Sequence, residues 1–223
     1  MNHIKINPKT GETRKIFVVG YDGGYSNWMQ AESVKKMEDA DLVLFTGGED
    51  ISPSLYNQPE HRTTSANPIR DRFEVEAYRK AMKLNKHKVG ICRGHQFLCA
   101  MSGGILVQHQ ANPAMYHGIE THDGQEIVIT SLHHQAAYPW RMNKGDYKVL
   151  AWANNHSPYH LGGKNEELKP YQDKEVEIAY FPKTRSYGIQ GHPEMMYGES
   201  HPEIDKTISY LQNQLDLFLA DAL

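Results

Sequence analysis

The sequence predicts an α/β fold in which mostly parallel strands are joined by crossover helices. Short apolar runs alternate with helix-compatible stretches through the first half of the chain. Two of these runs end in glycine-rich turns, and a third leads into a cysteine that lies between two glycines. We therefore expect a central sheet with the candidate functional residues where its strands end.

In the first half, the apolar runs and the helical stretches follow one another in regular order. The expected strands and helix lie, in chain order, at 15–20 (strand), 27–39 (helix), 42–45 (strand) and 88–91 (strand). Asn67 and Pro68 predict a further helix, because an asparagine N-cap followed by proline at the first helical position favours a helix start. One face of that helix is expected to consist of Phe73, Ala77 and Ala81.

The second half contains strands in closer succession. They are expected at 105–107, 126–129, 147–150, 176–180 and 186–190. Several of them alternate apolar with polar residues, as a sheet with one solvated face does. Apolar residues at helical spacing then predict an amphipathic closing helix that packs on the domain's own sheet, rather than forming an interaction surface: Ile204, Ile208, Leu211, Leu215 and Leu219.

Length and composition indicate one domain, 1–223, with enough apolar residues (39%) for a substantial core. The 24 Lys and Arg against 27 Asp and Glu give a net charge of -3, which argues against a nucleic-acid partner. There is no apolar stretch near the length of a membrane span and no secretion signal, so we expect no membrane association and a cytoplasmic location. The only cysteines, Cys92 and Cys99, are poorly placed for a disulfide and fit a reducing compartment.

Residues 90–96, Gly-Ile-Cys-Arg-Gly-His-Gln, predict a nucleophile elbow with Cys92 at its tip. A sharp strand-to-helix turn needs small residues on both sides, and Gly90 and Gly94 supply them. The helix N-terminus behind the turn favours negative charge on the sulfur. Cys99, in contrast, fits the buried face of the following helix.

The segment Gly191-His-Pro-Glu194 supplies the other two parts of a catalytic triad. His192 is the candidate base, and Glu194 is the carboxylate that would orient it. Cys92, His192 and Glu194 are therefore the predicted catalytic residues.

These motifs, together with Thr46-Gly47-Gly48 after a buried strand, resemble the class I glutamine amidotransferase-like superfamily. Within it the chain is most similar to the γ-glutamyl hydrolase branch, which includes γ-glutamyl-γ-aminobutyrate hydrolases. The stretches that point to this branch are 47–56, 70–74 and Ser131-Leu-His-His-Gln135. The resemblance implies a flavodoxin-like three-layer sandwich with a mostly parallel central sheet, and a cysteine hydrolase that needs no organic cofactor and no metal.

The resemblance also implies a γ-glutamyl thioester on Cys92, with His192 protonating the leaving amine and then activating water. The oxyanion needs aimed donors, and the candidates are the backbone N–H groups of Gly48 and Arg93. Residues expected to contact the substrate are Gln96, Ser131, His133 and His134. Asp71 and Glu74 lie one turn apart and are expected to form surface or inter-element salt bridges rather than to touch the substrate.

The thirteen histidines do not predict a metal site. His133 and His134 would point to opposite faces of a strand, and Pro158 argues against a helix that would bring His156 and His160 together.

The sequence departs from the family pattern in two places. The residue before the catalytic histidine is usually tryptophan but is Gly191 here, so either Tyr197 fills the space or the pocket is wider. The polar segment 154–173 has no clear counterpart in the family and is longer than most loops in compact domains.

The leading interpretation is a free-standing hydrolase of γ-glutamyl amide bonds, and a homodimer is compatible with it. The alternative is a glutaminase subunit that delivers ammonia to a separate synthetase or ligase, because the chain has no phosphate-binding loop of its own. A catalytically silent binding module is disfavoured by the intact triad. A cysteine peptidase or chaperone-like relative would place histidine directly after the nucleophile, where this chain has Arg93.

Overall fold

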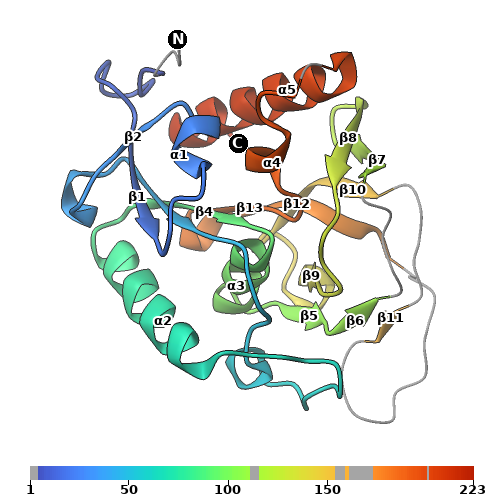
Figure 1. The fold of residues 1–223 in the computed structure, drawn as a ribbon. Helices are drawn as coiled ribbons and strands as arrows, with labels where there is room; N and C mark the ends of the chain where they lie inside the picture. Colours follow the sequence, from blue (N-terminus) through green and yellow to red (C-terminus); the bar gives the residue numbers. More distant parts are fainter. Residues whose placement is uncertain (1–4, 111–115, 154–158, 161–172, 200) are drawn as a thin grey trace.

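A computed structural model gives the fold of residues 5–110, 116–153, 159–160, 173–199 and 201–223. The chain forms three layers, with a twisted sheet between two groups of helices (Figure 1). This arrangement confirms the predicted α/β sandwich. Among the described residues, no helix is long and apolar enough to cross a lipid bilayer.

In the described residues the main sheet has nine strands, in the order β2-β1-β3-β4-β13-β12-β10-β7-β8. Pairing is parallel from β2 to β13 and antiparallel from β13 to β8, so the sheet is mixed rather than mostly parallel. The reason is short connections: β12 turns into β13 within 182–185, which is too short for a crossover. The strand bounds are β1 Lys15–Val19, β2 Glu32–Ser33, β3 Leu42–Phe45, β4 His87–Ile91, β7 Tyr116–Thr121, β8 Glu126–Thr130, β10 Lys148–Ala153, β12 Glu175–Phe181 and β13 Ser186–Ile189.

Two smaller strand pairs lie outside the main sheet. The predicted strand 105–107 belongs to one of them, where β5 (Ile105–Val107) pairs with β9 (Ala136–Tyr138). The other joins β6 (His109–Gln110) to β11 (Tyr159–His160). Figure 1 shows both on the same side of the main sheet as α3.

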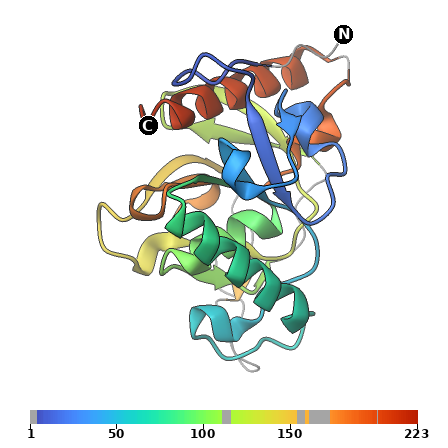
Figure 2. The same ribbon diagram turned by 90° about the vertical axis from the view of Figure 1, so that its left-hand side faces the viewer.

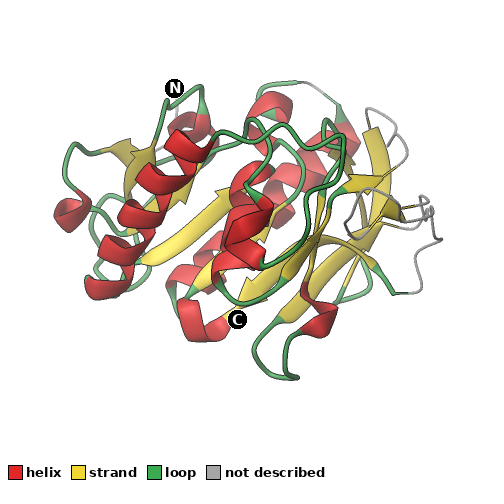
Figure 3. Cartoon of the chain, turned by 90° about the horizontal axis from the view of Figure 1, so that it is seen from below, coloured by secondary structure: helices red, strands yellow, loops and turns green. Residues whose placement is uncertain are grey.

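Helices cover both faces of the sheet. Figure 2 shows α5 (Pro202–Leu219) above the sheet and α2 (Pro68–Lys83) below it. The upper layer also contains α1 (Tyr25–Trp28) and α4 (Pro193–Met196), and the lower layer contains α3 (Arg93–Met101). Figure 3, a view from below, shows the strands twisting behind the lower helices. Short 3₁₀ turns lie at η1 Met37–Asp39, η2 Pro53–Tyr56, η3 Pro139–Arg141 and η4 Pro182–Thr184.

The closing helix packs on the domain's own sheet, as predicted. Leu211 and Leu215 are fully buried in the core between α5 and the sheet. Thr207 of α5 also bonds to both backbone groups of Val128, which protects β8 at the edge of the sheet. The helix thereby fixes the strand that leads to the active site.

One predicted helix is wrong, and another is confirmed at its start. Residues 27–39 do not form one helix: α1 ends at Trp28, and the chain then extends to pair as β2. In α2 the predicted N-cap is confirmed, since the Asn67 side chain accepts from the N–H groups of Ile69 and Arg70. Of the three residues expected on one face, Ala81 is buried and Phe73 is 59% exposed. The buried residues of the helix include two carboxylates: Asp71, Glu74, Tyr78 and Ala81.

Candidate active site

Cys92 occupies the tip of the predicted strand-to-helix turn. Its φ of 53° and ψ of -109° are strained for a residue with a side chain, as expected at a nucleophile elbow. The turn depends on its glycines, because a Cβ at residue 90 would overlap the backbone of Gly94, and one at residue 94 would overlap Phe45 of β3. The sulfur therefore lies at the N-terminus of α3, where the helix dipole stabilises negative charge.

His192 and Glu194 lie next to the elbow, at the start of α4. The Nδ1 atom of His192 is 2.7 Å from Oε1 of Glu194, which is buried. The N–H of His192 donates to the Thr130 hydroxyl at 2.7 Å, so the end of β8 holds the segment in place. Because Nδ1 is bonded to Glu194, Nε2 is the nitrogen available to Cys92.

The protonated form of His192 is strongly favoured. Burial opposes its charge, but the hydrogen bonds and charges of Cys92 and Glu194 outweigh burial and raise the pKa of His192 to about 10. An imidazolium beside the sulfur is the expected state of an activated cysteine at neutral pH.

The loop after β3 forms the opposite wall. A Cβ on Gly47 would lie 2.9 Å from Cε1 of His192 and 3.7 Å from the Cβ of Cys92, so only glycine fits between these side chains. Gly48 has a φ of 139°, and a Cβ there would overlap the Arg70 guanidinium. Gly47 therefore lies against the nucleophile and Gly48 follows it in the same loop, so the role of the Gly48 N–H as an oxyanion donor stays a prediction.

Tyr25 is a site residue that the sequence analysis missed. Its hydroxyl accepts from the N–H of Gly47 at 3.1 Å. Burial, and then the charge of Glu194, raise the pKa of Tyr25, which keeps the phenol neutral. The tyrosine follows a Gly-Gly turn in a segment expected to be loop, and no sequence signal identifies it.

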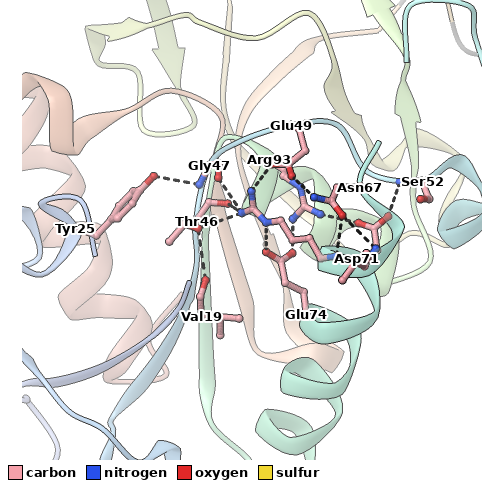
Figure 4. Close-up of polar contacts among 12 residues, drawn as sticks. Val19, Tyr25, Thr46, Gly47, Glu49, Ser52, Asn67, Asp71, Glu74 and Arg93 are labelled. Carbon is pink, nitrogen blue, oxygen red and sulfur yellow. Dashed lines mark hydrogen bonds and ion pairs between the residues drawn. The ribbon is translucent and has the colours of Figure 1, made fainter. Parts of the chain in front are cut away.

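A buried ion network supports the elbow from below (Figure 4). The Arg93 side chain is 1% exposed and pairs with Asp71 at 2.6 Å and with Glu74. Both carboxylates come from α2, so the salt bridges connect two elements, which is one of the two arrangements expected from the sequence. They are buried rather than on the surface. The Arg93 amide was predicted as a donor, whereas the role of its side chain was not foreseen.

Three of the predicted substrate-binding residues belong to one hydrogen-bonded group that also contains Gln135. The Gln135 carbonyl accepts from Nε2 of Gln96 and from Nδ1 of His133, both at 2.8 Å. With Nδ1 donating, Nε2 of His133 accepts from the Ser131 hydroxyl at 3.1 Å. Burial lowers the pKa of His133 to about 4, so this ring is neutral at pH 7. Contact of Gln96, Ser131 and His133 with a substrate remains a prediction.

His134 contacts a different residue, Asp50. Its Nε2 lies 3.0 Å from Asp50, and that hydrogen bond raises the pKa of His134. Within the described part of the chain, no group of three or more histidine, cysteine or acidic side chains is arranged to hold a metal ion. His156 lies outside the described residues, as does most of the polar segment 154–173.

Cys99 has the structural environment that was predicted. It is fully buried, and burial raises its pKa to about 12. Both cysteines are free thiols.

At Gly191, where the family resemblance led us to expect tryptophan, the structure shows what occupies the space. A Cβ there would overlap Ile129 and the carbonyl oxygen of Thr130. The space is therefore filled by β8, and neither Tyr197 nor a wider pocket is needed to explain the glycine. A pocket of about 450 Å³ is lined by His192 together with Gly48, Arg70 and Glu194.

Comparison with known proteins identifies the family. The model of the Peptidase C26 family matches residues 27–135. A glutamine amidotransferase-like protein of Lactococcus lactis subsp. lactis strain IL1403 is 44% identical over 209 residues, which cover 90% of this chain and 87% of the relative. A homologue from Lactococcus lactis subsp. cremoris is 33% identical over 117 residues, or 43% of this chain and 62% of that protein.

The fold has solved counterparts. A glutamine amidotransferase from Thermotoga maritima superposes with a TM-score of 0.56, covering 94% of this chain and 97% of that one at 11% identity. At that identity the likeness concerns the fold alone. The relative from strain IL1403 extends over nearly the whole chain, however, and we conclude that the chain belongs to the class I glutamine amidotransferase-like (Peptidase C26) family.

Proposed function

We propose that this protein is a cysteine hydrolase of γ-glutamyl amide bonds that acts through a γ-glutamyl thioester. Family membership already indicates amide hydrolysis. The observation that supports the nucleophile is the Cys92–His192–Glu194 arrangement, in which the imidazole bonds a buried carboxylate at 2.7 Å and has a pKa raised to about 10.

In the first half-reaction the Cys92 sulfur attacks the γ-carbonyl carbon, and the carbonyl π electrons move to the oxygen. The N–H groups of Arg93 and Gly48 stabilise that oxyanion. Collapse of the intermediate breaks the C–N bond, and His192 donates its proton so that a neutral amine or ammonia leaves.

In the second half-reaction, the now neutral His192 removes a proton from water. The hydroxide adds to the thioester, and collapse releases glutamate and regenerates the sulfur anion beside the imidazolium. Glu194 keeps the ring in the required orientation and tautomer throughout.

Among the predicted substrate residues, the Gln96–Gln135 contact supports a binding role. It connects α3 to the segment that contains Ser131 and His133, so the nucleophile and that segment keep a fixed distance. Because His133 is neutral, it would bind the glutamyl end of the substrate through hydrogen bonds rather than charge. The hydrogen bond to Asp50 raises the pKa of His134, which favours its protonated form relative to a free imidazole, so His134 is the candidate for a contact with the substrate carboxylate.

Glutamate release by the purified chain tests the proposal, with glutamine and a panel of γ-glutamyl amines and peptides as substrates. We expect turnover that is lost in Cys92→Ala and retained in Cys99→Ala. Turnover of a γ-glutamyl amine well above glutamine would identify the leaving group. If the thiol reacts readily with a glutamine-analogue electrophile but no substrate is hydrolysed, the free-standing hydrolase is wrong and a subunit that awaits a synthetase replaces it.

A further inference from the structure

The Arg70 side chain forms hydrogen bonds to the loop that contains the Gly47–Gly48 peptide. Nη2 of Arg70 donates to the carbonyl oxygen of Gly47 at 2.8 Å and to that of Thr46 at 3.1 Å. In a trans peptide the C=O and the following N–H point in opposite directions. By fixing the Gly47 carbonyl, Arg70 therefore fixes the direction of the Gly48 N–H, away from the guanidinium.

The N–H of Gly48 donates to no acceptor among the described residues, so it can donate to a substrate. The N–H of Gly47 already donates to the Tyr25 hydroxyl. The loop lies against the nucleophile, as the 3.7 Å from a Cβ on Gly47 to the Cβ of Cys92 shows. A small rotation of this peptide would turn the Gly48 donor away from a carbonyl bound at Cys92.

Arg70 is itself fixed by the buried ion network that contains Glu74 and Arg93. Its Nε donates to Oε1 of Glu74 at 2.8 Å, and the other oxygen of Glu74 accepts from Arg93. Glu74 is 1% exposed, so its two hydrogen bonds are poorly replaced by water. Glu49 holds the remaining guanidinium nitrogen at 2.7 Å. The buried carboxylate of Glu74 thus bridges Arg70, which bonds the Gly47–Gly48 peptide, and Arg93, whose N–H is the second proposed oxyanion donor.

We infer that Arg70 is a positioning residue that orients the Gly48 N–H toward the oxyanion. Glu74 holds Arg70 at a fixed position relative to the elbow. This inference rests on the proposed carbonyl chemistry at Cys92. The competing explanation is an ion pair that only stabilises the fold, which would leave the chemistry of the sulfur unchanged once the protein is folded.

Two reagents separate these explanations. p-Nitrophenyl acetate acylates a thiolate: the C–S bond forms, negative charge develops on the carbonyl oxygen, and p-nitrophenolate leaves as the tetrahedral intermediate collapses. Iodoacetamide alkylates the same sulfur by displacing iodide at a saturated carbon, and no oxyanion forms. The ratio of the two rates therefore reports the oxyanion donors, whichever amide is the natural substrate.

The experiment measures both rates on the wild type, Arg70→Ala and Arg70→Lys, with Cys92→Ala as background. Arg72→Ala is the matched control, since Arg72 is exposed on the same helix. Loss of one donor costs roughly 100- to 1000-fold in acyl transfer, so we expect misaiming to slow acylation about 10- to 100-fold. Alkylation should stay within about twofold of wild type, and methylguanidinium should partly restore acylation in Arg70→Ala.

Equal loss of both rates, or loss of neither, would overturn the inference. So would a wild-type Cys92 that is alkylated but not acylated. Failure of the γ-glutamyl panel with a normal acylation-to-alkylation pattern would instead contradict the proposed function alone.

Discussion

Replacing Arg93 with methionine should destabilise the protein strongly. The substitution keeps a long side chain but leaves Asp71 and Glu74, which are 3% and 1% exposed, without their shared cation. Removing one partner of a buried ion pair costs about 3–5 kcal/mol. Asp71 retains the Ser52 N–H at 3.0 Å and Glu74 retains Arg70, so we expect the lower end, about 3 kcal/mol.

Urea unfolding at neutral pH measures this loss, and calorimetry should show a fall in Tm of about 6–12 °C. Arg72→Met, an exposed change on α2, is the control and should stay within about 0.5 kcal/mol of wild type. Adding Asp71→Asn to Arg93→Met should cost less than the sum of the single changes, because the two residues are in contact. A loss below about 1 kcal/mol for Arg93→Met would refute the argument that the network is a buried structural support.

Three further predictions follow from the site. Glu194→Gln should lower the pKa of His192 from about 10, so the alkaline limb of the kcat/KM profile moves to lower pH; an unchanged limb would contradict the assigned partner. Burial lowers the pKa of His95 to about 3 and that of His133 to about 4, so as the pH falls below 6.5 these residues take up protons in the unfolded chain before they do so in the folded protein. The free energy of unfolding is therefore unaffected by them above pH 6.5 and decreases as the pH falls toward 4. Urea unfolding at pH 4.5 should show a loss on the order of 2 kcal/mol for each, which His133→Asn removes in part. Gly191→Ala should cost about 1–3 kcal/mol by overlap with Ile129, whereas Gly118→Ala, which meets no neighbour, should be nearly neutral in the same assay.

The sequence was most informative where a few consecutive residues carry the signal for a structure. Gly90 and Gly94 around Cys92 predict the elbow, because no larger residue fits the crossing with β3 and α3. The N-cap of α2 was predictable for a similar reason, since a polar side chain and a proline satisfy the helix start on their own. Both features can be recognised within a few consecutive residues, although the neighbour that excludes a side chain at residue 94 is Phe45 of β3.

Features that depend on distant contacts were not predictable. Tyr25 becomes a site residue only because α1 lies next to the Gly47 loop. The segment after Trp28 has helical composition but pairs with β1, and tertiary pairing overrides its propensity. The buried face of α2 was not predictable either, because the carboxylates of Asp71 and Glu74 are buried only through their pairing with Arg93, a residue of another element.

Mass spectrometry of the intact protein, quenched during turnover of a γ-glutamyl anilide, tests the central claim most directly. The proposed mechanism predicts one γ-glutamyl group on Cys92, present in Cys99→Ala and absent in Cys92→Ala. Because His192 activates the deacylating water, His192→Asn should acquire the adduct slowly and retain it longer than wild type. Turnover without any adduct, or an adduct that persists in Cys92→Ala, would contradict the assignment of Cys92 as the nucleophile.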